Sequence, residues 1–235
     1  MSLINLSRLL SDLKKTRNDN VFKGVIFDLD GTILNTDLYV VLNYARLFKK
    51  YAPNRIPSLK ELIYLSGPAL EDVFSEYLPE EDPEMLREDF VGWAKDNCNV
   101  FSSTYPEEVR VLDNFIRSGI KLGLVTNKST GATYSCLRYF DLLDKFSSIF
   151  PAERCLRKKP DPWAIEECVK ELKIEKSDTI YIGDDFSDIR AGKAAGIKTG
   201  LVRFGLKEVE GTDPDYSFDS YSQIERTIME YGKHQ

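Results

Sequence analysis

Continuously apolar, largely β-branched runs recur along the chain and predict the strands of a buried sheet. The clearest run occupies residues 22–30 and ends abruptly in acidic residues followed by Gly31. Because the runs are apolar throughout rather than alternating, we expect strands that are covered on both faces, as in a parallel sheet. Four further runs of this kind occur later in the chain, at 120–126, 146–150, 178–184 and 197–204.

Helical periodicity fills the intervals between these strands. The first such helix has Pro106 in its first turn and Gly119 just past its end, the positions at which these residues favour a start and a stop. Strands that alternate with helices predict βαβ units. We therefore expect an α/β fold, a Rossmann-like open parallel sheet with helices on both faces. The predicted helices lie at about 106–118, 130–141, 161–173 and 187–195.

The stretch 37–104 breaks this rhythm, because it has helical periodicity and no convincing strand. We predict an inserted all-helical cap domain at 37–104, and a core domain formed by 1–36 and 105–235. The first residues predict a short amphipathic helix at 3–16, whose leucines pack against the core. Those leucines are Leu3, Leu6, Leu9, Leu10 and Leu13.

Composition and charge exclude several functional classes. The formal net charge is −6, which argues against a nucleic-acid polymer as partner because such binding usually needs a basic face. The four cysteines form no C-x-x-C pair and His234 is the only histidine, so neither a zinc site nor a histidine-based triad is expected. With no apolar run of membrane-spanning length and no signal-peptide pattern, we expect a cytoplasmic protein that contacts no membrane.

The candidate chemistry lies where the predicted strands end. In an open parallel sheet, ligands bind outside the carboxyl ends of the strands, so the residues at these ends should meet at one edge. Acidic residues predominate among them, accompanied by a hydroxyl, an amide and a lysine. The set comprises Asp28, Asp30, Thr126, Asn127, Lys159, Asp184, Asp185 and Asp188.

This set of side chains is suited to phosphoryl transfer. Several carboxylates at one place repel one another unless a cation lies among them, and Mg²⁺ is a hard ion that takes oxygen ligands. Lysine and threonine suit the remaining oxygens of a phosphoryl group. Each position alone also has a structural explanation, since Asp30-Gly31 is a common turn pair and acids favour helix N-termini. All of these explanations together would require four coincidences at one sheet edge.

Four short motifs carry a resemblance to a known family. DLDGT (28–32), VTN (125–127), KKP (158–160) and GDDFSD (183–188) resemble, in order and spacing, the motifs of the haloacid dehalogenase superfamily. The resemblance extends over about 22–204. The helical insertion after the first motif is similar to the caps of the phosphoglycolate phosphatase and β-phosphoglucomutase branch.

The resemblance implies a role for each motif residue. Asp28 would be the nucleophile and a metal ligand, and Asp30 the general acid and base, with its backbone carbonyl on the metal. Thr126 and the backbone N–H of Asn127 would bind the phosphoryl oxygens. Lys159 would balance the negative charge of Asp28 and the phosphoryl group. Asp184 would be a metal ligand, and Asp185 and Asp188 would support the metal or its waters.

The expected activity is that of a Mg²⁺-dependent phosphatase acting on a small phosphorylated metabolite through an aspartyl phosphate on Asp28. Phosphoglycolate, a sugar phosphate, a nucleoside monophosphate and pyrophosphate all remain open as substrates. Alternatives are a β-phosphoglucomutase-like phosphotransferase and a non-catalytic binding protein of the same fold. The protein would be a monomer or a homodimer. Cations of the insertion are candidate substrate contacts, although a solvated helix face explains most of them better: Arg46, Lys49, Lys50, Arg55 and Lys60.

Overall fold

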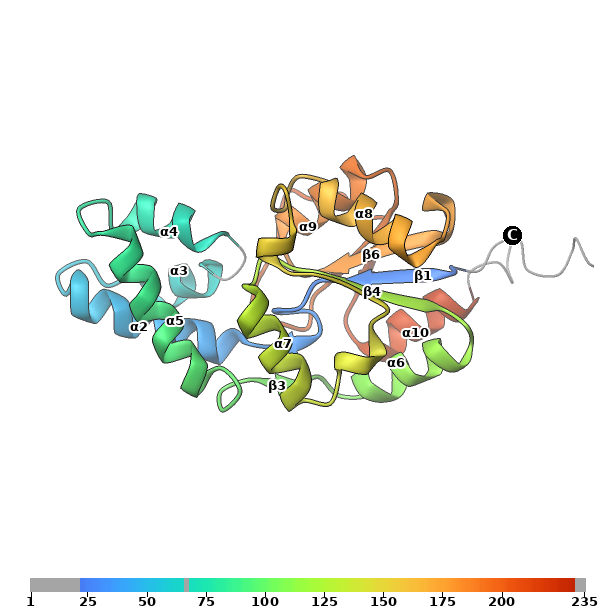
Figure 1. The fold of residues 1–235 in the computed structure, drawn as a ribbon, viewed down its shortest axis with the longest axis horizontal. Helices are drawn as coiled ribbons and strands as arrows, with labels where there is room; N and C mark the ends of the chain where they lie inside the picture. Colours follow the sequence, from blue (N-terminus) through green and yellow to red (C-terminus); the bar gives the residue numbers. More distant parts are fainter. Residues whose placement is uncertain (1–21, 66–67, 231–235) are drawn as a thin grey trace, which may run out of the picture.

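The computed structural model describes residues 22–65 and 68–230. The helix expected at 3–16 lies outside these residues. A six-stranded parallel sheet forms the centre of the molecule, with the strand order β5-β4-β1-β6-β7-β8 (Figure 1). The predicted fold class, an open parallel sheet between helices, is confirmed. The strands are β1 (Gly24–Phe27), β4 (Lys121–Val125), β5 (Ser148–Phe150), β6 (Thr179–Gly183), β7 (Lys198–Val202) and β8 (Tyr216–Phe218).

Alternate residues of the central strands face two separate apolar cores. Val25 and Phe27 of β1 belong to one core, whereas Ile26 belongs to the other. This two-sided burial explains why the strand sequences are apolar throughout. On the Val25 side lie α6 (Glu108–Arg117), α7 (Thr130–Tyr139) and α10 (Tyr221–Glu230), and on the other side lie α8 (Trp163–Leu172) and α9 (Phe186–Ala194).

Strand register brings the motif residues to one edge. Phe27, the last residue of β1, is level with Leu124 of β4 and with Ile182 of β6. The backbone N–H of Asp28 then donates to the carbonyl of Ile182 at 2.9 Å. The chain positions just beyond these three strand ends therefore open onto the same side of the sheet.

Four helices, called the cap below, lie beyond this edge of the sheet (Figure 1). Their packing is aromatic, with the rings of Tyr44 and Phe90 4.9 Å apart between centroids. The start of the fourth helix is well specified: Asp82 accepts hydrogen bonds from two backbone N–H groups, and Pro83 occupies the first helical position. The helices are α2 (Asp37–Tyr51), α3 (Leu59–Tyr64), α4 (Leu70–Tyr77) and α5 (Pro83–Asn97). The exact division into domains stays a prediction.

Two short strands connect the cap to the core, and the sequence interpretation missed them. β2 (Leu34–Asn35) pairs antiparallel with β3 (Ser103–Thr104), so the expectation of no strand in 37–104 is wrong at its last two residues. Each of these strands has only two residues, which is too few to show the hydrophobic pattern of a strand in the sequence. Because both chain connections run through this pair, it is the natural hinge between cap and core.

The segment after residue 205, for which no element was predicted, completes the core. β8 pairs with β7, and α10 packs on the sheet with the Tyr221 hydroxyl donating to the carbonyl of Thr32 at 2.7 Å. Within residues 22–65 and 68–230, the connections also contain three 3₁₀ turns: η1 (Leu143–Lys145), η2 (Ala152–Arg154) and η3 (Lys176–Asp178).

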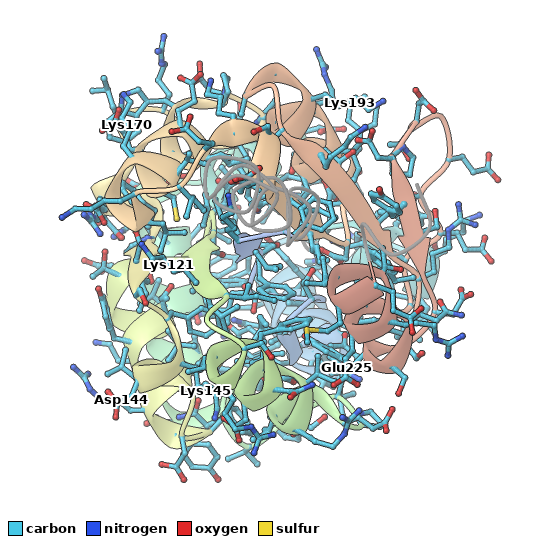
Figure 2. All side chains as sticks on the ribbon, turned by 90° about the vertical axis from the view of Figure 1, so that its right-hand side faces the viewer. Lys121, Asp144, Lys145, Lys170, Lys193 and Glu225 are labelled. Atoms are coloured by element: carbon cyan, nitrogen blue, oxygen red, sulfur yellow. The ribbon has the colours of Figure 1, made fainter. Side chains whose placement is uncertain are left out.

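Charged side chains, labelled in Figure 2, lie at the end of the molecule away from the cap: Lys121, Asp144, Lys145, Lys170, Lys193 and Glu225. Charged side chains at this end pair locally, as Arg110 does with Glu225 at 2.9 Å and Lys145 with Asp113. Exposed pairs of this kind contribute little to stability. Within the part of the chain that the structure describes, no helix is both long and apolar enough to cross a membrane.

Candidate active site

The strand-end residues meet in a buried cluster at the cap-facing edge of the sheet. Asp28 follows β1, Thr126 follows β4 and Asp184 follows β6, and these residues are 7%, 2% and 5% exposed. Lys159, from the loop before α8, is 8% exposed and completes the cluster. Charges this deeply buried need partners, and each has one.

Lys159 links two carboxylates. Its Nζ lies 2.8 Å from Asp28 Oδ1, an ionic contact without hydrogen-bond geometry, and 2.6 Å from Asp188 Oδ1. Asp188 is fully buried, and its second oxygen accepts from the backbone N–H of Asp185 at the start of α9. The Tyr181 hydroxyl lies 3.0 Å from Asp188 and accepts from Lys159 at 3.1 Å. Asp188 and Tyr181 thus orient the lysine toward Asp28.

A second lysine, Lys207, forms ion pairs with Asp184 and Asp185. Its Nζ lies 3.0 Å from Asp184 Oδ2 and 3.4 Å from Asp185 Oδ2. Asp185 also accepts from the backbone N–H of Ser187 and so caps α9. Nothing in the sequence pattern pointed to Lys207, because it lies about twenty residues beyond the last motif in a segment without periodicity.

Gly31 allows Asp184 to lie close to the first motif. Its φ is +76°, a conformation that favours glycine, and a Cβ added there would be only 2.2 Å from Asp184 Oδ2. The Tyr105 hydroxyl donates to the Gly31 carbonyl at 3.2 Å and holds this turn from the opposite side. A glycine is therefore required here for both backbone conformation and space.

Asp30 has a different partner from the other acids. The Nζ of Lys128 lies 2.8 Å and 3.1 Å from its two oxygens and 5.2 Å from the ring centroid of Tyr39 in the cap. Sequence reasoning missed Lys128, although it directly follows Thr126 and Asn127 at the same strand end and could have been found there. Asp30 and Lys128 therefore form a separate pair at the border between core and cap.

Thr126 and Asn127 shape the loop that faces Lys159. Thr126 Oγ1 accepts from the backbone N–H of Lys128 at 3.1 Å, which leaves its hydroxyl hydrogen available to a ligand. The Asn127 side chain accepts from the backbone N–H of Lys159 at 3.1 Å and donates to its carbonyl at 3.3 Å. Asn127 thereby fastens the Lys159 loop to the end of β4.

Burial has shifted the acid–base properties of the cluster. It raises the pKa of Asp28 to about 6 against the opposing charge of Lys159, and it raises the pKa of Asp184 to about 8 against that of Lys207. Burial also disfavours the charged form of Lys159, but Asp188 and Asp28 outweigh this and raise its pKa. An added cation would favour the ionised form of each carboxyl group.

The donor set fits a hard divalent cation. Asp28, Asp184 and Asp188 offer carboxylate oxygens that lie within 4.8 Å of one another. Among the described residues, Asp184 Oδ1 is buried and has no hydrogen-bond partner, so it is free for a ligand, whereas both oxygens of Asp188 are engaged. Asp28 and Asp184 would therefore be better placed than Asp188 to bind such a cation. Mg²⁺ typically uses one or two protein carboxylates together with waters and substrate oxygens.

A cavity of about 350 Å³ lies between this cluster and the cap. Asp28, Asp30, Thr126 and Lys159 line its floor. Its far wall is formed mainly by buried apolar and aromatic side chains of the cap, namely Tyr39, Val40, Tyr44, Leu65, Phe90 and Ala94.

The cap cations that the sequence suggested do not line this cavity. Arg46 and Lys50 both form ion pairs with Asp89 of α5, where they join α2 to α5. Lys49, Arg55 and Lys60 are exposed and are not among the lining residues. The solvated-face explanation therefore holds for these three residues, and Arg46 and Lys50 stabilise the cap.

Comparison with known proteins agrees with this geometry. Residues 25–202 match the sequence model of the haloacid dehalogenase-like hydrolases. The pyrophosphatase PpaX of Halalkalibacterium halodurans is 31% identical over 206 residues, which cover 85% of this chain and 94% of the relative. The chain therefore belongs to the haloacid dehalogenase-like hydrolases, and the prediction of a phosphatase-type enzyme is confirmed at that level.

Solved structures agree in fold. One, from Bacteroides fragilis and described as a haloacid dehalogenase-like hydrolase, has a TM-score of 0.80 at 22% identity and covers 86% of this chain and 99% of its own. A predicted phosphoglycolate phosphatase from Haemophilus somnus 129PT has a TM-score of 0.76 at 23% identity, with 86% and 96% covered. At such identities the likeness concerns the fold alone.

Proposed function

We propose that the protein is a Mg²⁺-dependent phosphatase that hydrolyses a small phosphate monoester through an aspartyl phosphate on Asp28. One observation carries the proposal: Asp28 lies buried beside Lys159 at the floor of a cavity that Asp30 and Thr126 also line. A carboxylate attacks a phosphate dianion only when both negative charges are screened, and Lys159 is held in place to do so.

The reaction divides into two displacements. Asp28 attacks phosphorus while the bond to the leaving oxygen breaks, and Asp30 donates a proton to that oxygen. Asp30 then takes a proton from a water molecule, whose oxygen displaces Asp28 and releases inorganic phosphate. Thr126 donates a hydrogen bond to the phosphoryl group, and Lys159 balances its charge throughout.

Asp28, Asp184 and the backbone carbonyl of Asp30 would hold Mg²⁺, with Asp185 and Asp188 in support. When bound, the ion supplies charge neutralisation at the phosphoryl oxygens. The buried, unpartnered oxygen of Asp184 supports this assignment. Lys207 holds Asp184 and Asp185 in position beside the site.

The cavity wall favours an organic leaving group. The name of the PpaX relative raises pyrophosphate as a substrate, but pyrophosphate would place a second highly charged group against apolar cap residues such as Val40 and Phe90. Of the other cations that line the cavity, Lys128 is paired with Asp30 and Lys95 is exposed, so a second buried phosphate against this wall would be poorly compensated. An ester with a partly apolar alcohol instead gains by contact with this wall.

The test is phosphate release from a panel that includes pyrophosphate, phosphoglycolate, a sugar phosphate, a nucleoside monophosphate and an aryl phosphate, with Mg²⁺ and with excess chelator. We expect Mg²⁺-dependent release, with kcat/KM lowest for pyrophosphate, and loss of turnover in Asp28→Asn. Retained turnover in this variant would remove Asp28 as the nucleophile. Formation of an isomeric sugar phosphate without phosphate release would favour a mutase instead.

Location and assembly remain predictions. We propose a cytoplasmic protein that acts on a small phosphorylated metabolite as a monomer or a homodimer, and no described surface feature requires a polymeric partner. Sedimentation of the full chain would distinguish the two oligomeric states.

A further inference from the structure

Two cysteines far apart in the sequence meet between cap and core. The Sγ atoms of Cys98 and Cys136 lie 3.3 Å apart. Cys98 ends cap helix α5, and Cys136 belongs to core helix α7. A contact this short brings the two sulfur atoms within reach of a disulfide, whose S–S bond measures about 2 Å.

Both thiols can be reached from the cavity above the active site. The side chains are 5% and 1% exposed, yet both belong to the cavity lining together with Asp28 and Asp30. A small oxidant that enters the cavity would therefore meet the pair, whereas the protein surface shields it from large reagents.

The surroundings of the pair favour Cys98 over Cys136 as the thiolate. The hydrogen bond with Cys136 lowers the pKa of Cys98, and the positive charge of Lys128 assists, whereas burial opposes the shift. The same hydrogen bond and burial raise the pKa of Cys136. The thiolate is the form that attacks an oxidant, so the pair has one nucleophilic sulfur and one resolving sulfur.

We propose that Cys98 and Cys136 form an oxidisable dithiol that a peroxide converts into a disulfide joining the cap to the core. The Cys98 thiolate attacks one oxygen of hydrogen peroxide, which gives a sulfenic acid and, after protonation of the leaving hydroxide, one water. Cys136 then attacks that sulfur, its thiol proton leaves with the hydroxyl as a second water, and the S–S bond forms. Two thiols are oxidised and one peroxide is reduced.

The disulfide would restrain the cap close to the β2–β3 pair that connects it to the core. Cys98 lies five residues before β3, one of the two strands through which the cap is connected. A covalent bond from there to α7 adds a third connection beside the hinge. Opening and closing of the cap, which substrate entry and product release require in enzymes of this architecture, would then be slowed.

The two remaining cysteines provide internal controls. Burial raises the pKa of Cys155 to about 11 and that of Cys168 to about 12, so both thiols stay protonated. Neither belongs to the cavity lining. Cys155→Ala and Cys168→Ala variants should therefore keep the response to peroxide.

The experiment treats the full chain with hydrogen peroxide, blocks free thiols and maps the non-reduced peptides by mass spectrometry. We expect free thiols to fall from four to two, a linked peptide containing Cys98 and Cys136, and slower hydrogen exchange at β2 and β3. The rate of phosphate release should fall about tenfold, as gating by the cap would predict, and recover with dithiothreitol. Cys98→Ala and Cys136→Ala should each lose this response relative to their own untreated rates.

Several outcomes would overturn the proposal: no linked peptide, oxidation confined to Cys155, or a linked peptide with unchanged hinge exchange. The peptide map and hydrogen exchange need no substrate. They decide the matter even if the proposed phosphatase activity fails, because only the rate measurement rests on that proposed function. Peptide mapping of the wild type also needs no variant to fold.

Discussion

The cap-facing edge of the core sheet, called the core edge below, and the cap differ in where their charged residues lie. Those of the core edge gather at the site, whereas the cap pairs Arg46 and Lys50 with Asp89 between its helices and away from the cavity. At the core edge, Lys159 holds Asp28, which lines the cavity, and Lys207 holds the neighbouring Asp184 and Asp185. The cap presents mainly apolar and aromatic side chains to the site, and Lys95 of α5 is a cation among them.

This difference suggests a division of labour between the two regions. Fixed charges at the core edge are oriented before a ligand arrives, which is what stabilisation of a transferring phosphoryl group requires. In the proposed reaction, the apolar cap wall would exclude water and contact the leaving group, and so affect which substrate is chosen. Substitutions in the core edge should therefore change the rate for every substrate, whereas those in the cap should change substrate preference or stability.

After the loss of turnover in Asp28→Asn, the largest effect is expected from Gly31→Ala, because the new Cβ would displace Asp184. Such a Cβ would be 2.2 Å from Asp184 Oδ2, and a shift of a reacting group by about 1 Å can cost about 10²-fold in rate. We expect kcat to fall by about that factor or more for all substrates, measured by phosphate release.

Gly119→Ala is the matched control for that prediction. Gly119 has a similar φ of +80°, but nothing within the described part of the chain lies within 4 Å of an added Cβ. It should lose about 1–2 kcal/mol of unfolding free energy through backbone strain and keep its kcat. An equal loss of kcat in both variants would show that backbone strain, and not contact with Asp184, matters at Gly31.

The next largest effect is expected from Lys128→Met, which leaves Asp30 without its partner. Because Lys128 orients Asp30 from 2.8 Å, its loss should lower kcat about tenfold and shift the pH dependence of kcat. Lys50→Met is the matched control, since Lys50 lies 2.6 Å from Asp89 in the cap. Steady-state rates across pH measure both variants, and an equal loss of kcat in Lys50→Met would break the contrast between core edge and cap.

The sequence predicted the part of the site that depends on local chain order. Asp28, Thr126 and Asp184 each follow a continuous apolar run, and parallel strands place such residues at one edge. The structure brings the predicted residues together as expected, while the roles given to them stay predictions. The fold class followed from the same alternation of strands and helices.

The parts that the sequence could not predict depend on contacts between distant segments. Lys207 reaches Asp184 from a loop without a pattern, and β3 has only two residues. The thiols of Cys98 and Cys136 meet only because the end of a cap helix lies against α7. Spacing in the chain gives no sign of such pairs, whose geometry is set by packing.

A smaller effect, on the pH dependence of stability, is expected from Glu108. Among the described residues, no lysine lies as close to this buried acid of the core as those that pair with Asp28 and Asp184. Burial raises the pKa of Glu108 from 4.5 to about 8, although its Oε2 accepts from the backbone N–H of Tyr105. Since the folded state then binds the extra proton, this contribution to stability is complete below about pH 4.5 and is lost as the pH rises through about 8. Asp89 of the cap behaves oppositely: hydrogen bonds from Lys50, Tyr51 and Arg46 overcome burial and lower its pKa to about 2.

Glu108→Gln should therefore flatten the fall in stability between pH 5 and pH 8. At pH 8 we expect the variant to exceed the wild type by about 1–2 kcal/mol in unfolding free energy, and at pH 5 the two should be similar. Urea unfolding at both pH values provides the measurement. Parallel pH dependences in variant and wild type would mean that Glu108 is not the group whose ionisation destabilises the core.

The smallest expected effect separates cap stability from catalysis. Gly92 lies in cap helix α5, and no described atom lies within 4 Å of an added Cβ, so Gly92→Ala should stabilise by about 0.5–1 kcal/mol. Gly123→Ala in β4 is the contrasting variant, because its Cβ would be 2.5 Å from Cys168 Sγ and overpacking costs about 1–3 kcal/mol. Unfolding curves and kcat should show Gly92→Ala more stable at unchanged rate, since Gly92 itself does not line the cavity. A lower kcat in that variant would mean that a looser α5 is needed for the cap to move.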